Sequence, residues 1–211
     1  MNAIFRNVLV GASLASVAII VSGCASAGVK NPSGTGVTVM RADEAGFVAG
    51  TGIESQDLVA VTDKIARNIL NVPEIKNATV TPRVVLDPVV NETRFTINKD
   101  MFLTRIQTDL ISKSAGKVRF LARDRMVALE HERQMKRTGQ VTTTADPNVN
   151  EFKGGDYLLT GKLQGLTTRT TKGTSDYILY TFELIDMRTS EIVFKDSMEV
   201  KKQGQEDAAY R

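Results

Sequence analysis

Three segments near the C-terminus alternate apolar and polar residues, and each is long enough to form a β-strand. The apolar positions are Tyr157, Leu159 and Leu163, then Ile178, Tyr180, Phe182 and Leu184, then Ile192, Phe194, Met198 and Val200. A period of two places the apolar residues on one face of a sheet and the polar residues on the other. The connection at residues 188–190 is short enough for a hairpin. The sequence therefore predicts a three-stranded antiparallel meander whose apolar face must be covered by helices.

Three helices are predicted ahead of this meander. The first has an apolar stripe at spacings of three and four residues, with Ser55 as its expected cap and Pro73 at its end. The stripe consists of Leu58, Val61, Ile65 and Ile69. A second helix is expected from about Asn98 to Ser114, with Phe102, Ile106 and Leu110 on its core face. A third is expected from Asp124 to about Arg137, before Gly139.

Two apolar runs between these helices, residues 80–90 and 118–121, predict strands. The first contains Val84, Val85 and Leu86, a continuous run typical of a strand covered on both faces, and residues 91–96 follow it as a polar loop. The order helix, strand, helix, strand, helix favours parallel pairing through crossover helices. We therefore expect an α/β (α+β) domain: a mixed sheet with two parallel-type strands, the antiparallel meander, and helices packed on it. Residues 139–155 are expected to form a mobile surface loop.

Cys24 is the single cysteine of the chain, and it follows a segment typical of an export signal. Arg6 supplies the positive charge, residues 8–21 supply an apolar centre, and small residues precede the cut. This apolar run is too short for a permanent spanning helix, which needs about 20 apolar residues. The stretch from Val21 to Cys24 resembles the bacterial lipobox, which implies that the Cys24 thiol is lipidated and becomes the mature N-terminus. The alternative is a buried free thiol.

This interpretation divides the chain into four parts. They are a signal peptide at 1–23, a flexible tether at 24–54, a globular domain at 55–202 and a C-terminal tail at 203–211. A random coil of about 30 residues, rich in glycine as the tether is, has a root-mean-square reach of roughly 30 Å. Ala25 and Ser26 follow the cysteine in place of an aspartate, which favours the outer membrane, facing the periplasm. Without the signal peptide, 26 Lys plus Arg face 24 Asp plus Glu, so charge does not indicate a nucleic-acid partner.

Two partial motifs fail as sites for chemistry. His131 is the only histidine and begins a His–Glu pair, but a zinc-binding helix needs a second histidine four residues on, where Met135 stands. The stretch from Gly155 to Lys162 fails as a phosphate loop, because five residues separate its glycines and Leu163 replaces the hydroxyl residue. We therefore expect no enzyme, no cofactor and no metal site. A Ser–His–Asp arrangement that assembles only in space stays open.

Four stretches resemble the LpoB type of penicillin-binding protein activator, a family of outer-membrane lipoproteins. They are residues 84–93, 118–126, 156–161 and 182–193. The resemblance implies a small domain like the N-terminal domain of TolB, with no enzymatic role. In this family the lipoprotein reaches from the outer membrane through peptidoglycan and docks on a class A penicillin-binding protein, whose glycan polymerisation and crosslinking it stimulates. Known members carry a long proline-rich linker, whereas residues 25–54 contain only Pro32.

Arg94 and Phe95, together with the polar outer face of the meander, are the candidate partner-binding surface. Arginine and aromatic side chains dominate binding energy at interfaces, and these two lie together in the loop 91–96. The other interpretation is that Phe95 packs the following helix against the core. For the whole protein, the alternative is a secretion or assembly lipoprotein related to the curli exporter CsgG, which has a similar soluble fold and forms rings.

Overall fold

The computed structural model describes residues 37–46, 50–142 and 152–204. The chain divides into two units, Met1–Arg41 and Ala42–Arg211. In the first unit only residues 37–41 are described, and they are exposed and form neither helix nor strand. The predictions for Cys24, the signal peptide, most of the loop 139–155 and most of the tail fall outside the described residues.

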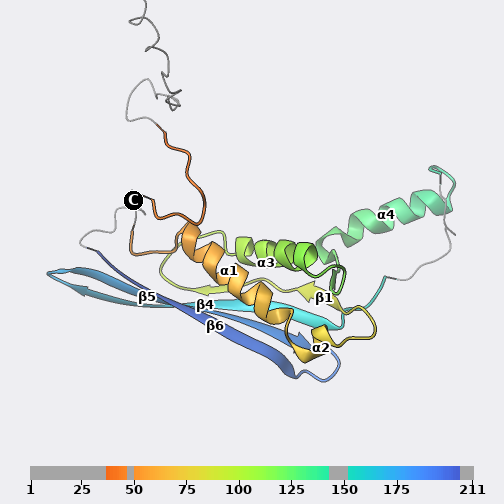
Figure 1. Cartoon of the computed structure of the whole chain (residues 1–211). Helices are drawn as coiled ribbons and strands as arrows, with labels where there is room; N and C mark the ends of the chain where they lie inside the picture. Colours follow the sequence, from red (N-terminus) through yellow and green to blue (C-terminus); the bar gives the residue numbers. More distant parts are fainter. Residues whose placement is uncertain (1–36, 47–49, 143–151, 205–211) are drawn as a thin grey trace, which may run out of the picture. The chain divides into compact units, whose positions relative to one another are not determined.

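A six-stranded mixed sheet forms the centre of the second unit (Figure 1). Its strands are β1 (Arg83–Leu86), β2 (Val90–Glu92), β3 (Arg119–Phe120), β4 (Tyr157–Thr170), β5 (Gly173–Asp186) and β6 (Ile192–Gly204). The order is β3-β1-β4-β5-β6, and β2 pairs separately with β4. β1 runs parallel to β3 and β4, β2 runs parallel to β4, and β4, β5 and β6 pair antiparallel. The predicted mixed sheet and meander are confirmed, and β6 continues two residues past the expected domain end at residue 202.

The helices are α1 (Ser55–Ile69), α2 (Pro73–Lys76), α3 (Asp100–Lys113), the 3-10 turn η1 (Arg123–Arg125) and α4 (Met126–Arg137). α1 and α3 cover one face of the sheet, whereas α4 extends away from it (Figure 1). α1 and α3 contact each other and lie along the same side of the sheet (Figure 1). The three predicted apolar positions of α3, Phe102, Ile106 and Leu110, are all buried. In contrast, α4 has no buried residue.

The caps of the first helix differ from the prediction. Glu54, not Ser55, is the N-cap: its backbone N–H donates to Asp57 Oδ2 at 2.9 Å, and its own side chain accepts from the first turn. The longer carboxylates of Glu54 and Asp57 form a reciprocal pair that the serine hydroxyl does not displace. Pro73 begins α2 instead of ending α1, because a proline at the first helical position loses no hydrogen bond.

The caps of the other two helices also move by a residue or two. Lys99 is the N-cap of α3, although Asn98 Oδ1 still accepts the backbone N–H of Asp100 at 3.3 Å. Asp124 lies inside η1, so α4 begins two residues later than expected. Helix termini are fixed by whichever side chain reaches the free N–H groups, which spacing alone does not specify.

Three strand predictions were wrong in part. β2 lies at the start of the predicted loop 91–96, where Asn91 pairs with Leu163 of β4. In β6, Ile192 was expected to face the core but is 53% exposed. The pairing with β5 shifts between Leu184 and Ile185, so an irregularity takes Ile192 out of the alternation. In β1 only Val84 is buried, so the strand is not covered fully on both faces.

The core lies between α1, α3 and the inner face of β4 and β5. The ring centroid of Phe102 lies 5.6 Å from that of Tyr180 and 6.1 Å from that of Phe182, with tilted planes. Gly161 faces the core from β4, and a Cβ there would lie 2.6 Å from two atoms of the Phe182 ring. The missing side chain at Gly161 is therefore what lets Phe182 lie across β4 under α3.

Candidate functional site

The second face of the meander is not covered by any helix of the described region (Figure 1). We call it the outer face. Its side chains alternate with the buried ones: Leu158, Thr160, Lys162, Gln164 and Leu166 from β4, Tyr177, Leu179, Thr181, Glu183 and Ile185 from β5, and Lys195, Ser197, Glu199 and Lys201 from β6. All of them are half-buried or exposed. The outer face is therefore available to a partner without any change in the sheet.

An apolar strip runs across the middle of the outer face. Leu166 lies directly opposite Tyr177, and Leu179 is the next outward residue on β5. Leu166 is 66% exposed, although exposing a leucine side chain to water costs free energy. Two causes raise the pKa of the Tyr177 hydroxyl: its burial, and the nearby carboxylate of Glu199, which accepts a hydrogen bond from this hydroxyl. The strip of Leu166, Tyr177 and Leu179 is thus uncharged and offers one aromatic ring.

Glu199 and Lys201 of β6 lie directly opposite Leu179 and Tyr177, and two pairs of oppositely charged residues lie further along the outer face. Lys162 Nζ lies 2.8 Å from Glu92 Oε1, and Lys195 Nζ lies 2.7 Å from Glu183 Oε1. Both pairs cross between neighbouring strands and are solvated, so each contributes little to stability. They leave the outer face close to electrically neutral, with its apolar strip framed by polar groups, as is common at protein interfaces.

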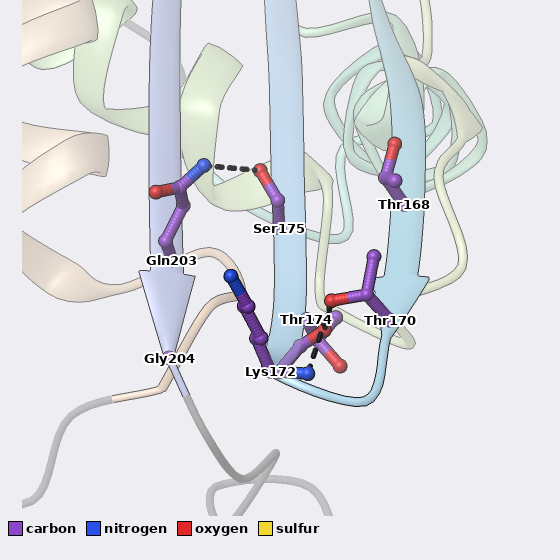
Figure 2. A pocket seen from close by; sticks show the side chains of 8 residues that line it. Thr168, Thr170, Lys172, Thr174, Ser175, Gln203 and Gly204 are labelled. Atoms are coloured by element: carbon purple, nitrogen blue, oxygen red, sulfur yellow. Dashed lines mark hydrogen bonds between the residues drawn. The ribbon is translucent and has the colours of Figure 1, made fainter.

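A polar hollow of about 410 Å³ lies at the far end of the meander (Figure 2). Gln203 Nε2 donates to Ser175 Oγ at 3.2 Å, and Thr170 Oγ1 accepts the backbone N–H of Lys172 at 3.2 Å. Thr168 lies opposite Ser175 in the register and extends the same polar row. Most side chains that line the hollow are threonines and serine, so the hollow forms the polar end of the outer face.

The structure places Arg94 and Phe95 next to the core. Phe95 is 4% exposed, and the Arg94 guanidinium carbon lies 4.2 Å from the centre of its ring. Arg94 also donates to Asp176 through Nε at 3.0 Å and Nη2 at 2.6 Å, and its Nη2 donates to Thr51 Oγ1 at 3.3 Å. Phe95 therefore packs in the core, as the second of the two interpretations of this residue expects. Binding of a partner by Arg94 and Phe95 stays a prediction.

Asp176 is a buried charged residue beside the loop 91–96 that no sequence motif indicates. It occupies an inward position two residues before Ile178, and its side chain is 1% exposed. A carboxylate at an inward position of an apolar strand requires a cation or several hydrogen-bond donors as partners. An aspartate at such a position is therefore the feature of the sequence that could have indicated this site. Burial alone would raise the pKa of this carboxyl, but hydrogen bonds from Arg94, Thr167 and Thr51 outweigh burial and lower it from 3.8 to about 2.

This shift predicts a loss of stability in acid. The carboxylate of Asp176 binds its proton less readily in the folded chain than in the unfolded chain, so its stabilisation is complete above pH 3.8 and is lost as the pH falls toward 2. A difference of this size corresponds to about 2 kcal/mol. Urea unfolding between pH 6 and pH 2 should show this decline, and Asp176→Asn should flatten it. An unchanged pH profile in the variant would assign the decline to other carboxylates.

A second inward charge, Lys202, fastens the segment ahead of α1. Its Nζ donates to the carbonyl of Gly52 at 3.0 Å and to Asp57 Oδ2 at 2.6 Å, and lies 3.6 Å from Glu54 Oε2. Thr51 in the same segment is 2% exposed. Residues 50–54, which the sequence assigned to the tether, are therefore packed against the far end of the meander.

Catalytic or metal-binding clusters do not emerge from the described residues. His131 is exposed on α4, beside Glu130. Within those residues, no three His, Cys, Asp or Glu side chains lie close enough together to hold a metal ion. None of the described helices has the length and apolar character needed to cross a membrane.

Comparison with known proteins decides the family. The model of the family described as "Peptidoglycan-synthase activator LpoB" matches residues 57–200, over two thirds of the chain. The chain belongs to the LpoB family. The resemblance found in the sequence is thereby confirmed, and so is the expectation that the chain is not an enzyme, since LpoB proteins are activators without enzymatic activity.

Solved structures similar to this LpoB-family chain include two domains of the same family. The LpoB C-terminal domain from Salmonella enterica is 14% identical, with a TM-score of 0.43, and that from Escherichia coli is 14% identical, with a TM-score of 0.40; each match covers 69% of this chain and 99% of the other. Lipoprotein GNA1162 from Neisseria meningitidis is 13% identical over 61% of this chain and 88% of its own, with a TM-score of 0.35. The search of curated proteins found no match.

Proposed function

We propose that this protein is a lipid-anchored periplasmic regulator that binds a class A penicillin-binding protein and stimulates its synthesis of peptidoglycan. The observation that carries the proposal is the family match over residues 57–200. The sequence from Val21 to Cys24 supports a lipid anchor at Cys24 in the outer membrane, with residues 1–23 removed and the segment from Cys24 to residue 54 as the tether.

The outer face is the surface on which we expect the synthase to dock. In the apolar strip Leu166 is exposed and Tyr177 and Leu179 are half-buried, and aromatic and apolar anchors inside a polar frame supply most of the binding energy at interfaces. Stimulation further requires that the chain bind the active state of the synthase more tightly than the inactive state. A preformed sheet favours affinity for the synthase, because little conformational entropy is lost on binding.

The proposal is tested by measuring binding and glycan polymerisation with the class A synthases of the same cell. Leu166→Ser combined with Tyr177→Ser is expected to weaken binding at least tenfold and to lower stimulation at the same protein concentration, because truncation of central anchors costs about 2 kcal/mol or more. The matched control is Ile111→Ser, which removes a comparably exposed apolar side chain, 54% exposed, from α3 on the helical side. Failure of the unaltered protein to bind any class A synthase would refute the function, and equal losses in both variants would refute the docking face.

A further inference from the structure

A groove of about 680 Å³ opens at the opposite end of the sheet from the polar hollow. It lies where β1 and β4 begin and β5 ends, since Tyr157 pairs with both Val84 and Asp186. The volume is within the range of about 300–1,000 Å³ that is usual for small-ligand sites. We call it the end groove.

The floor of the end groove depends on a glycine. A Cβ at Gly155 would lie 2.5 Å from Val85 Cγ2 and 3.0 Å from the sulfur of Met187. Met187, 49% exposed, and Val80, 70% exposed, add apolar surface to the walls, and Tyr157 adds an aromatic ring. The end groove therefore combines apolar walls with a backbone that approaches closely enough to exclude side chains from its floor.

Six charged residues line the end groove, and the side chains of four of them form hydrogen bonds or ion pairs within the chain. Asp156 Oδ2 accepts the backbone N–H of Arg83 at 2.7 Å, with the Arg83 guanidinium at 4.0 Å. Asp186 Oδ1 accepts the backbone N–H groups of Arg188 and Thr189, at 2.8 and 3.1 Å, and these bonds lower its pKa. The Nη2 of Arg123 donates to the carbonyl of Lys153 at 3.0 Å. These groups hold the groove together.

Three polar groups of the end groove remain available. The guanidinium of Arg188, the carboxylate of Glu74 and the hydroxyl of Tyr157 make no hydrogen bond or salt bridge with the described part of the chain, although all three lie in its lining. Burial, with the carboxylates of Asp186 and Glu74 next, raises the pKa of Tyr157, so its hydroxyl keeps its proton and can donate. The available set is therefore one cation, one anion and one neutral donor.

From this set we propose that the end groove binds a short peptide through one free carboxylate and one free ammonium group, and that the ligand is the uncrosslinked stem peptide of peptidoglycan. Arg188 pairs with the carboxylate in the planar geometry that guanidinium groups favour, Tyr157 donates to it, and Glu74 accepts the ammonium. The exposed Met187 contacts the small side chains between the two charges. Naming the stem peptide rests on the proposed function, which places the domain at the site of peptidoglycan synthesis.

The test is calorimetric titration of the full chain, purified in detergent, with Nα-acetyl-L-Lys-D-Ala-D-Ala, which has one ammonium and one carboxylate. The C-terminal amide of this peptide lacks the carboxylate, and its Nε-acetyl form lacks the ammonium. We expect each altered peptide to bind at least fivefold more weakly. Equal affinity for all three peptides, or no binding at millimolar concentration, would overturn the proposal.

Two substitutions assign the charges. Arg188→Gln should remove the preference for the free carboxylate over the amide, and Glu74→Gln should remove the preference for the free ammonium over the acetylated form. Arg169→Gln, an exposed arginine near the far end of β4, is the matched control and should preserve both preferences. Preserved preferences in the first two variants would also overturn the proposal. No synthase takes part in these titrations, so a failure here leaves docking on the outer face intact, and a failure to bind a synthase leaves peptide binding intact.

Discussion

Asp176→Ala is expected to lower the free energy of unfolding by about 3–5 kcal/mol, because it removes the buried partner of an ion pair and leaves the positive charge of Arg94 without its counter-charge. Asp176 receives two hydrogen bonds from Arg94 and one from Thr167, and its side chain is 1% exposed. Single domains have total stabilities of about 5–15 kcal/mol, so this one change removes a large fraction. Urea unfolding at pH 7, followed by circular dichroism, measures the loss.

The controls for this prediction separate a buried pair from an exposed one. Glu183 lies on the same strand as Asp176 but on the outer face, where it pairs with Lys195, whose side chain is 58% exposed. Glu183→Ala should therefore lower the free energy of unfolding by about 1 kcal/mol or less. The double variant Arg94→Met with Asp176→Leu replaces both charges by apolar groups and should recover much of the loss. If Asp176→Ala and Glu183→Ala cost the same, the pair with Arg94 is not the stabilising feature that its geometry indicates.

Most features that depend on a local sequence pattern were predicted correctly, and several features that depend on contacts between distant parts of the chain were not. The meander and the core positions of α3 were predictable, because alternation and helical spacing report directly which side chains face the core. The position of β2 was not, since three residues of strand are specified by their partner Leu163 in β4 and not by their own composition. The exposure of Ile192 depends on a shift in strand register, which no local pattern reports.

The apolar strip and the end groove also depend on contacts between distant parts of the chain, so the sequence alone did not predict them. Tyr177 and Leu179 share a face of β5, but only the antiparallel register brings Leu166 of β4 beside them to form one strip. The end groove likewise combines α2, β1, η1, the start of β4 and the turn after β5, five places with no common motif. In contrast, the inward charges Asp176 and Lys202 can be recognised in the sequence once the alternation is extended to them, because each interrupts an apolar row. A buried charge in an alternating strand is therefore a useful sign of a tertiary partner.

Cys24→Ser is expected to abolish lipid attachment and to move the protein almost entirely from the membrane fraction to the soluble fraction. A thiolate is a far better nucleophile than a hydroxyl at neutral pH, and each buried methylene of an acyl chain contributes about 0.8 kcal/mol to anchoring. Incorporation of labelled palmitate, followed by fractionation of the envelope, measures both effects. Ser26→Ala, two residues on, is the matched control and should be labelled and retained like the unaltered protein.

The same variant separates anchoring from activation. Lys202 fastens the segment at Gly52 to the domain, so in the proposed arrangement the reach of the domain is set by the residues between Cys24 and residue 50. Purified Cys24→Ser protein should bind and stimulate the synthase in solution as well as the unaltered protein, because residues 57–200, which match the family, do not include Cys24. In cells it should lose stimulation, since the lipid sets the local concentration near the wall. Retained labelling of Cys24→Ser would refute the anchor, and lost stimulation in solution would mean that the N-terminus itself contacts the synthase.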